Sequence, residues 1–241
     1  MMKTKIFYLG IAMIAILFTS CYKVEDSATL EDYDITLTYY NTDFNFQSYQ
    51  TFMVRDSVML ISDYLTDEQK DNFYTEGNSE KIRTKIVNEF KALGYTEVTT
   101  SENPDFMVNP TLTLMQQTSV AYYPGWWWGY PGYWGWYGDW YWKSTNYYYP
   151  YWGYYPSWGA SYYTYKTGTL IMEMADGKSV RDFQQWVEDT NGNGDAEDAP
   201  EIDFNWTGHV EGVIGDNAKY NEQRAANGIS EAFTQSPYLK K

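Results

Sequence analysis

One segment of the sequence has the side chains and spacing of a calcium-binding loop. It begins at Asp189 and reads "DTNGNGDAEDAPEID", with oxygen-bearing side chains at its first, third and fifth positions and a glycine at the sixth. Hard cations such as Ca²⁺ need oxygen ligands, and the glycine allows the sharp turn that gathers them. Pro200 stands where a bidentate glutamate is usual, so another acidic side chain has to complete the site. The candidate ligands are Asp189, Asn191, Asn193, Asp195 and Asp198.

The same segment has a second interpretation, in which it is a flexible acidic turn that holds no cation. Asn, Asp and Gly are common turn residues for reasons unrelated to metals. The sequence leaves both interpretations open. If calcium binds, we expect the weak affinity of extracellular sites, about 10⁻⁴–10⁻³ M, and a role in making the loop rigid.

Catalytic motifs are absent from the sequence. His209 is the only histidine, which excludes a zinc site built on several histidines, and it is predicted to be structural. No serine lies in a Gly-x-Ser-x-Gly elbow, and neither phosphate-binding glycine motif occurs. Carboxylates such as Asp176, Asp203 or Glu211 could hydrolyse glycosides as a pair, but spacing along the chain does not give their separation. The sequence therefore predicts a protein that is not an enzyme, with a carboxylate-dependent hydrolase of cell-envelope glycans as the alternative.

The most unusual segment is aromatic. Residues 122–165 hold 15 Tyr and 9 Trp, separated by glycine and proline. Their spacing has neither a strand nor a helix period, which argues against ordinary core. Tyr and Trp give stiff, amphipathic contact area, and both favour the membrane–water interface. We expect a partly self-packed loop that presents rings to a glycan, the membrane interface or an envelope protein. Its candidate binding residues are Trp126, Trp127, Trp128, Trp134, Trp136, Trp140 and Trp142.

The N-terminus indicates the compartment. Lys3 and Lys5 precede an apolar run, residues 6–18, that is too short to span a bilayer and has the layout of a secretory signal peptide. Phe18-Thr19-Ser20-Cys21 resembles a bacterial lipobox. That resemblance implies cleavage after Ser20 and fatty acyl chains, such as palmitate, on Cys21. We expect a lipoprotein of the cell envelope, on the outer membrane of a Gram-negative cell.

The charge of the mature chain excludes one class of partner. Removal of residues 1–20 takes away two of the 17 basic residues and none of the 32 acidic ones, which leaves a formal charge of −17. Such a surface is repelled by phosphate backbones, and no basic groove accompanies the aromatic rings. We therefore expect a membrane partner through the lipid and no nucleic-acid partner.

Periodicity predicts an α+β fold: a mostly antiparallel sheet packed by two helices, with a long Tyr/Trp/Gly-rich insertion. Residues 21–32 are an acidic tether, and a single domain follows over 33–235, with the aromatic insertion at 122–165 and an acidic loop at 188–203. The predicted strands are 33–39, 51–54, 106–114, 165–176 and 204–214, and the predicted helices are 79–93 and 218–233.

Several details of these elements can be checked. Pro110 predicts an edge strand or a bulge, and Asp176-Gly177 a turn that ends its strand. Phe204, Trp206 and Val210 are predicted to share one face of the strand over 204–214, with His209 on the other. The predicted helix caps are Ser79, Gly94 and Asn217.

Short motifs in a fixed order resemble a family of bacterial lipoproteins that share a domain of unknown function. They cover most of residues 33–235, and Tyr-, Gly- and Trp-rich stretches occur in that family at the same place. The resemblance implies an anchored envelope domain with no assigned reaction, and it does not extend to the acidic loop. The motifs are the strand from Tyr33, "DFNFQSYQTF", a helix that ends in "LGY", Pro104-Asp105, "GTLIMEMAD" and "WTGHVEGVI" before a final helix.

Overall fold

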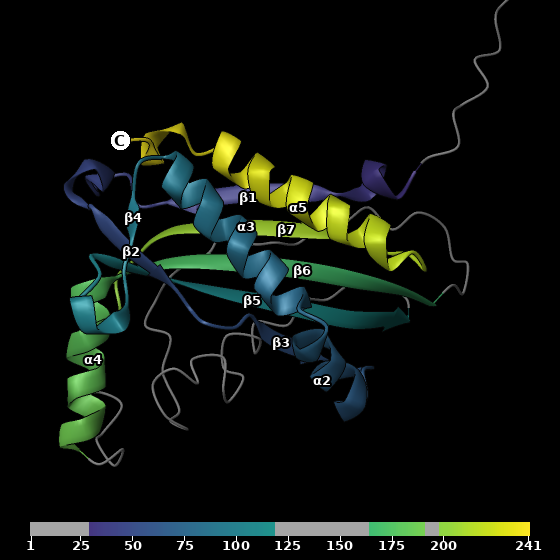
Figure 1. The fold of residues 1–241 in the computed structure, drawn as a ribbon, viewed down its shortest axis with the longest axis horizontal. Coiled ribbons are helices and arrows are strands. Elements are labelled where there is room, and N and C mark those ends of the chain that lie inside the picture. The colour runs from purple at the N-terminus through teal and green to yellow at the C-terminus, as the bar shows by residue number, and fades with distance from the viewer. Residues whose placement is uncertain (1–28, 119–163, 191–197) are drawn as a thin grey trace, which may run out of the picture.

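The structure is organised around one seven-stranded sheet (Figure 1). This computed structural model describes residues 29–118, 164–190 and 198–241. The strands are β1 (Ile35–Tyr40), β2 (Thr51–Val54), β3 (Met59–Ser62), β4 (Thr96–Glu97), β5 (Phe106–Thr118), β6 (Thr164–Asp176) and β7 (Phe204–Ile214). The described helices are α2 (Asp67–Thr75), α3 (Asn78–Ala92), α4 (Gly177–Asp189) and α5 (Ala218–Thr234), with short 3₁₀ turns η1 (Leu30–Tyr33), η2 (Phe46–Ser48), η3 (Thr100–Glu102) and η5 (Pro237–Leu239).

The fold is α+β, but the sheet is mixed, which corrects the expectation of a mostly antiparallel one. The strand order is β1-β7-β6-β5-β2-β4, and β3 also pairs with β5. The β1–β7, β7–β6 and β6–β5 pairs are antiparallel, whereas β2–β5, β3–β5 and β2–β4 are parallel. Helices α2 and α3 lie between β3 and β4 in the chain, and a helical crossover is what brings a chain back in the same direction.

The prediction that Pro110 marks an edge strand or a bulge is wrong, because β5 lies inside the sheet. On one side β5 pairs with β6 along its whole length. On the other side β2 pairs with residues 106–108 and β3 with residues 111–114. Pro110 lies between the segments of β5 that pair with β2 and with β3, so neither of these two strands pairs with it.

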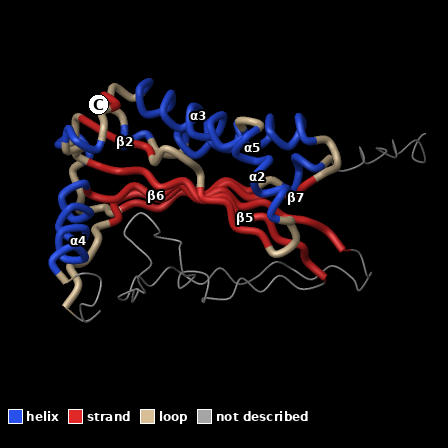
Figure 2. Tube along the Cα trace, turned by 60° about the horizontal axis from the view of Figure 1, so that its bottom comes forward, coloured by secondary structure: helices blue, strands red, loops and turns tan. Residues whose placement is uncertain are grey.

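Helices α3 and α5 cover one face of the sheet (Figure 2). The core between them is aromatic: Phe90 of α3 contacts Phe106, and its ring meets Phe233 of α5 edge-on at 4.8 Å. Trp206 of β7 is buried there, and its indole N–H donates to the Ser236 hydroxyl at 2.8 Å. The predicted helices α3 and α5, the cap at Asn217 and the left-handed Gly94 are confirmed.

Strand β7 departs from its predicted pattern at one end. Trp206 and Val210 share the helix-covered core as predicted, but Phe204 packs in a second cluster with Met107 and Phe183. The register shifts between Met174 and Ala175 of the neighbouring β6, so the residues before Trp206 are out of phase. The alternation of apolar and polar residues along β7 does not predict a bulge of this kind.

Three predicted ends also need correction. Asp176-Gly177 does not make a turn between strands; Asp176 caps α4, and its Oδ1 accepts from the Ser179 N–H at 2.7 Å. Gly77, with φ 78°, precedes α3 in place of the predicted cap Ser79. Tyr33 belongs to η1, so the first strand begins later, at Ile35.

Candidate functional site

The face of the sheet that points away from α3 and α5 is unusually rich in threonine. Pairing across β5, β6 and β7 aligns Thr113 with Thr169 and Glu211, and Asn109 with Glu173 and Thr207. Partners in a ladder lie on one face, and every second residue of each strand belongs to it. We call this surface the threonine face; it consists of Asn109, Thr111, Thr113, Thr167, Thr169, Ile171, Glu173, Thr207, His209 and Glu211.

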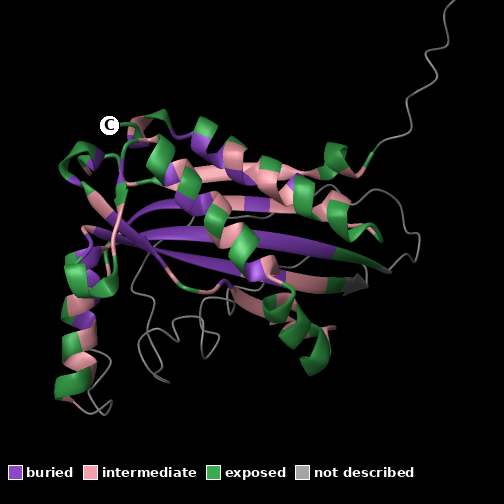
Figure 3. Cartoon of the chain, viewed as in Figure 1, coloured by how far each residue is buried: buried purple, intermediate pink, exposed green. Residues whose placement is uncertain are grey.

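Most of the threonine face is removed from solvent. Much of the length of β5 and β6 is accordingly coloured as buried in Figure 3. Thr111 is 0% exposed, Thr113 is 1% and Glu173 is 2%. Threonine, asparagine and glutamate are mostly exposed in proteins, and a buried polar group normally has a hydrogen-bond partner. The hydroxyls of Thr111 and Thr113 and the amide nitrogen of Asn109 are buried without one among the described residues. The Asn109 side-chain oxygen accepts from Arg55 at 3.5 Å.

His209 is a neutral member of this face. It lies opposite Trp206 and Val210, as its alternation predicts, and Tyr39 of β1 meets its ring edge-on at 6.1 Å. Burial lowers the pKa of His209 to about 4, because a charged imidazole would lose its hydration there. His209 is therefore uncharged at physiological pH.

A second polar cluster lies at the far end of β6. The Tyr49 hydroxyl donates to Asp176 Oδ2 at 2.6 Å, and the Asn205 amide donates to that hydroxyl at 3.3 Å. Burial and the Asp176 carboxylate together raise the pKa of Tyr49 far above its ordinary value. With Asp176 Oδ1 capping α4, both oxygens of this carboxylate are engaged.

The Asp105 carboxylate, like that of Asp176, is engaged in hydrogen bonds within the fold. Its Oδ2 accepts from the backbone N–H groups of Gln50 and Thr51 at 2.8 and 2.9 Å and from the Thr51 hydroxyl. Burial works against the charge, but these hydrogen bonds outweigh it and hold the pKa of Asp105 below its usual value. The Asp105 carbonyl also accepts from the Gly177 N–H at 2.7 Å.

The three carboxylates proposed for hydrolysis do not form one group. Asp176 and Asp203 are neighbours, and burial followed by the Asp176 charge raises the pKa of Asp203. Glu211 pairs with Thr169, seven residues along β6 from Asp176. At about 3.3 Å per residue, that places Glu211 roughly 23 Å away, well beyond the separation of a glycosidase pair.

The predicted calcium ligands fall partly outside the described residues. Asp189 is the last residue of α4, is exposed, and its Oδ1 accepts from Gln185 at 2.8 Å. Asp198 is also exposed. Asn191, Asn193 and Asp195 lie outside the described ranges, and within those ranges no three His, Cys, Asp or Glu side chains gather as a metal site would need.

Other predicted sites also lie beyond the described residues. Cys21 precedes them. Of the predicted insertion 122–165, only the last two residues are described, and they belong to β6. None of the described helices is long and apolar enough to cross a bilayer. The undescribed binding candidates are Trp126, Trp127, Trp128, Trp134, Trp136, Trp140 and Trp142.

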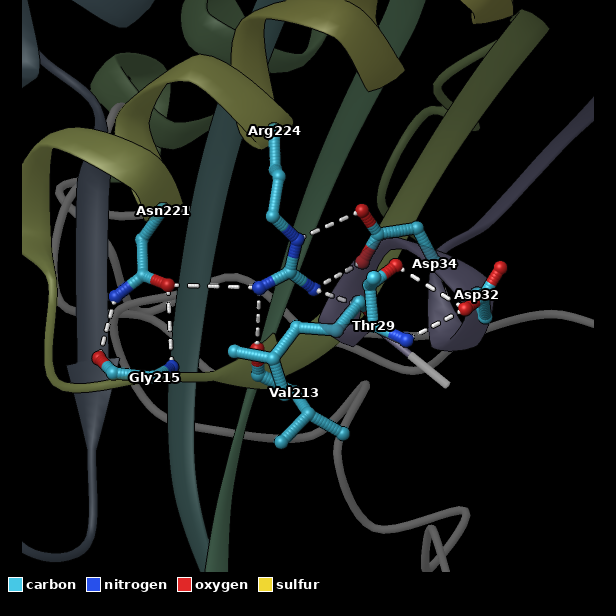
Figure 4. Close-up of polar contacts among 8 residues, drawn as sticks. Thr29, Asp32, Asp34, Val213, Gly215, Asn221 and Arg224 are labelled. Atoms are coloured by element: carbon cyan, nitrogen blue, oxygen red, sulfur yellow. Dashed lines mark hydrogen bonds and ion pairs between the residues drawn. The ribbon is translucent and has the colours of Figure 1, made fainter. Parts of the chain in front are cut away.

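A buried arginine fixes the beginning of the domain (Figure 4). Arg224 of α5 is 6% exposed and reaches Asp34, with Nε 2.9 Å from Oδ2 and an ion pair from Nη2 to Oδ1. Its other donors bind the carbonyls of Val213 at 2.7 Å and Leu30 at 3.1 Å. The sequence reasoning missed Arg224, although it lies one helical turn before Gly228 on the inward side of α5.

Comparison with known proteins identifies the family. The family model described as a domain of unknown function, DUF4136, matches residues 36–238. The chain belongs to the DUF4136 family. A search of curated proteins finds no match for this DUF4136 chain.

Solved structures include a relative in the same family. The crystal structure of a DUF4136 family protein from Bacteroides thetaiotaomicron shares 27% identity, with a TM-score of 0.50, and the match covers 87% of this chain and 98% of that one. A PelC dodecamer from Paraburkholderia phytofirmans also matches, with 10% identity and a TM-score of 0.35, over 86% of this chain and 99% of that one. The predicted resemblance to a family of unknown function is confirmed.

Proposed function

We propose that this DUF4136 protein is a lipid-anchored protein of the bacterial envelope, on the outer membrane of a Gram-negative cell, that works by contact and not by catalysis. Cys21 would carry the acyl chains, and the aromatic segment 122–165 would make the contact. One relationship in the structure supports this proposal most directly. The end of the sheet at which the chain enters the domain is also the end at which the aromatic segment is attached.

The strand register establishes that relationship. Thr118 of β5 pairs with Thr164 of β6, so the two attachment points of the aromatic segment lie side by side. Lys166 of β6 pairs with Ile214 of β7 at the same end. The entering chain lies against this end of β7, since a Cβ on Gly215 would come 2.6 Å from Leu30 of η1.

The tether is short compared with the sheet. Thr29 is eight positions after Cys21, and an extended chain spans at most about 3.6 Å per position, or roughly 29 Å in total. A 13-residue strand such as β6 is about 43 Å long. A lipid on Cys21 would therefore hold the entry end near the bilayer and leave the Asp176 end farther away.

The described surface at this end suits an interface. Tyr33 of η1 is 57% exposed and Tyr165 at the start of β6 is 37% exposed. Tyrosine favours the headgroup layer, where its ring and its hydroxyl are both accommodated. Among the partners that the sequence leaves open, we therefore choose the membrane interface over a glycan or an envelope protein. The acidic chain favours zwitterionic headgroups, because anionic lipids would repel it.

Brominated lipids test this proposal. The lipidated protein is reconstituted into phosphatidylethanolamine vesicles whose lipids carry bromine near the headgroup, and tryptophan fluorescence is recorded. We expect quenching that falls markedly when Trp126, Trp127 and Trp128 are changed to Phe. If bromine quenches both proteins equally, the aromatic segment does not contact the membrane. An emission shift on addition of soluble cell-wall glycans instead would assign the segment to a sugar ligand.

Mass spectrometry of the protein from envelope fractions tests the anchor. Acylated Cys21 at a new N-terminus is expected, and Cys21→Ser should keep residues 1–20 attached. An unmodified thiol in the wild-type protein would refute the anchor.

One observation favours the alternative function of a glycan hydrolase. The raised pKa of Asp203 beside Asp176 is the kind of perturbation that active sites use. A screen of the protein on cell-wall polysaccharides decides the matter, since turnover that Asp203→Asn abolishes would replace the binding proposal.

A further inference from the structure

Strand β1 is the outermost strand of the sheet next to α5, and no other described strand lies beside its outer edge (Figure 1). Its described partner is β7, and that pairing runs without a register shift from Ile35 to Tyr40. An edge strand presents backbone N–H and C=O groups to which another chain can add. The direction of these groups along β1 therefore decides what the edge can bind.

Alternate residues of β1 point their backbone groups away from β7. In an antiparallel pair, every second residue exchanges both of its hydrogen bonds with the partner strand, and the residues between them face outward. The Asn41 N–H donates to the carbonyl of Asn205 in β7 at 2.9 Å, so the odd-numbered residues of β1 face β7. The backbone groups of Thr36, Thr38 and Tyr40 therefore face outward.

Most of these outward groups have no partner in the described chain. The Thr36 carbonyl accepts from the Gln235 side chain of α5 at 3.3 Å, which agrees with its outward direction. No described residue forms a hydrogen bond with the outward N–H and C=O groups of Thr38 and Tyr40. Tyr40 is 45% exposed, and its ring stacks on that of Tyr238 at 3.7 Å. An incoming strand would meet free backbone groups with a fixed aromatic ring at one end.

The other edges of the described sheet are shorter or closed. Strand β4 has two residues, and its Glu97 pairs with Lys91 at 2.6 Å and with Arg83 at 2.8 Å. In β3 the Leu60 N–H donates to the Tyr74 hydroxyl of α2 at 3.2 Å. Short edges, charges, proline and covering groups are the usual protection against unwanted pairing. Strand β1 has six residues, ITLTYY, with neither a charge nor a proline, so its edge lacks that protection.

The charges around β1 indicate the kind of partner. Glu31 and Asp32 precede the strand and Asp43 follows it, and all three are exposed. Lys240, two residues after Tyr238, is an exposed base near the Tyr40 end, so acids outnumber bases around the strand. Charge complementarity therefore favours an incoming strand whose own ends are basic.

A second copy of the chain fits this edge poorly. Antiparallel pairing of two β1 strands about Thr38 would bring Asp32 of one copy towards Asp43 of the other, because these residues lie six and five positions to either side of Thr38. Like charges opposed across paired strands are destabilising. The formal charge of −15 on each chain adds a general repulsion.

We propose that β1 is a docking edge for an extended segment of another protein, with an uncharged, β-branched centre and basic residues at its ends. The outward groups of Thr36, Thr38 and Tyr40 supply the hydrogen bonds, and main-chain bonds of this kind give strand addition its affinity. The acidic flanks and the Tyr40 ring supply the preference for basic ends. Because β7 lies between β1 and β6, this inference adds a protein partner to the proposed membrane contact and does not rest on it.

Hydrogen–deuterium exchange of the full chain tests the docking. The probe is the peptide acetyl-Lys-Lys-Thr-Val-Thr-Val-Thr-Lys-Lys-amide, and mass spectrometry follows the fragment that contains residues 35–40. Saturating peptide should slow the exchange of the outward amides about tenfold, because an added strand removes them from water. The same peptide with Glu in place of each Lys should protect much less, and one N-methylated throughout its centre should not protect at all.

Substitutions at Thr38 separate backbone binding from side-chain binding. Thr38→Pro removes an N–H that does not bond to β7, and proline is tolerated on an edge strand where the N–H faces solvent. This variant should lose the protection while urea denaturation shows a folded protein; if it does not fold, the N-methylated peptide tests the same bonds. Thr38→Val is the matched control and should bind as the wild type does. Loss of binding by Thr38→Val would assign the site to the hydroxyl and overturn strand addition.

Charge reversal tests the chemistry of the partner. The double variant Glu31→Lys with Asp43→Lys should protect better with the Glu peptide than with the Lys peptide. An unchanged preference would contradict the basic partner.

Three further results would overturn the proposal. They are no protection by the Lys peptide, protection that survives N-methylation, and protection without peptide that rises with protein concentration, which would assign the edge to a second copy. Brominated-lipid quenching reports on the aromatic segment and not on β1, so the two proposals fail separately.

Discussion

Arg224 of α5 and Asp34 before β1 form a buried ion pair that joins the last α-helix to the first described residues of the chain. The Arg224 side chain is 5% exposed and the Asp34 side chain 27%. Two further donors of Arg224 bind the carbonyls of Leu30 and Val213, so one side chain connects η1, β7 and α5. Arg224 therefore holds η1, the first described element, against β7 and α5.

Removal of the arginine should be costly. Arg224→Ala leaves the Asp34 charge half-buried and two carbonyls without their donor. We expect a loss of about 3–5 kcal/mol in the free energy of unfolding, the range for breaking a buried pair. Urea denaturation at pH 7 measures it.

An exposed pair is the matched control. Lys81 and Glu222 are 2.9 Å apart with side chains 51% and 49% exposed, and such pairs contribute about 0–1 kcal/mol. Lys81→Ala should therefore be nearly neutral. Equal losses for the two alanine variants would show that Arg224 has no special role.

Gly212 provides an independent test of the same pair. A Cβ at this position would clash with Asp34 Oδ1 and lie 2.8 Å from Arg224 Nη2, so Gly212→Ala has to displace the contact. We expect a loss of about 1–3 kcal/mol, as for other overpacked sites. A double-mutant cycle with Asp34→Ala should show strong non-additivity by urea denaturation. Additive losses would mean that the methyl group acts elsewhere.

The Tyr49 hydroxyl should contribute more to stability than an ordinary one. Tyr49→Phe keeps the ring contact with Phe106 but removes the hydrogen bond to the Asp176 carboxylate. Hydrogen bonds to charged groups contribute about 1.5–3 kcal/mol, against about 1 for neutral pairs. Tyr95→Phe is the control, because the Tyr95 hydroxyl donates to the neutral carbonyl of Leu239 at 2.8 Å. Chemical denaturation should rank Tyr49→Phe as the more damaging change, and the reverse order would contradict the assigned role of Asp176.

Local patterns predict the elements of this fold better than their pairing. Alternation locates β5 and the residues Phe106, Val108 and Leu112 on its helix-covered side, and a helical stripe locates Ile229 and Phe233 of α5. Parallel pairing of β2 and β3 with β5 is a long-range result of the α2–α3 crossover, which alternation within one strand does not encode.

Helix α4 shows how one motif can support two structures. Asp-Gly after a strand predicts a turn, but aspartate is equally a helix cap. The apolar spacing of Val180, Phe183 and Val187 could have decided between them, since it has a helical period.

The threonine face could be located from the sequence but not characterised. The polar side of β7 that contains His209 follows from alternation. Alternation also assigns Thr111 and Thr113 to the side away from the core, where threonines are read as exposed, yet both are buried. What covers a second face depends on the rest of the chain, and no pattern within the strand reports it.

The half-buried His209 should make stability depend on pH. Its pKa is lowered by burial to about 4 from an unfolded value near 6.5. Between these values the unfolded chain binds a proton that the folded chain does not, so stability falls as pH drops from about 6.5 towards 4. Glu173 and Glu211 share the face with His209, and burial is the cause of its lowered pKa.

The size of this pH-dependent loss of stability can be measured by comparison with a variant that has no titrating group at position 209. The full shift corresponds to at most about 3.4 kcal/mol. His209→Gln should flatten the difference between urea denaturation at pH 7 and at pH 4.5 relative to the wild type. An imidazole that titrates near pH 6.5 by NMR would refute the depressed pKa.

Calcium binding by the acidic loop remains a prediction, and Asp189 offers a sharp test of it. With a dissociation constant of about 10⁻⁴–10⁻³ M, 5 mM Ca²⁺ should stabilise the folded protein by roughly 1–2 kcal/mol, because the ligand binds only the native state. Differential scanning calorimetry should show a higher melting temperature with Ca²⁺ and none of this increase for Asp189→Ala. Asp182→Ala is the matched control, since Asp182 is an exposed carboxylate of the same helix that pairs with Lys178. Unchanged melting of the wild type, or equal loss in both variants, would mean that the loop is an acidic turn whose charges attract cations without a site.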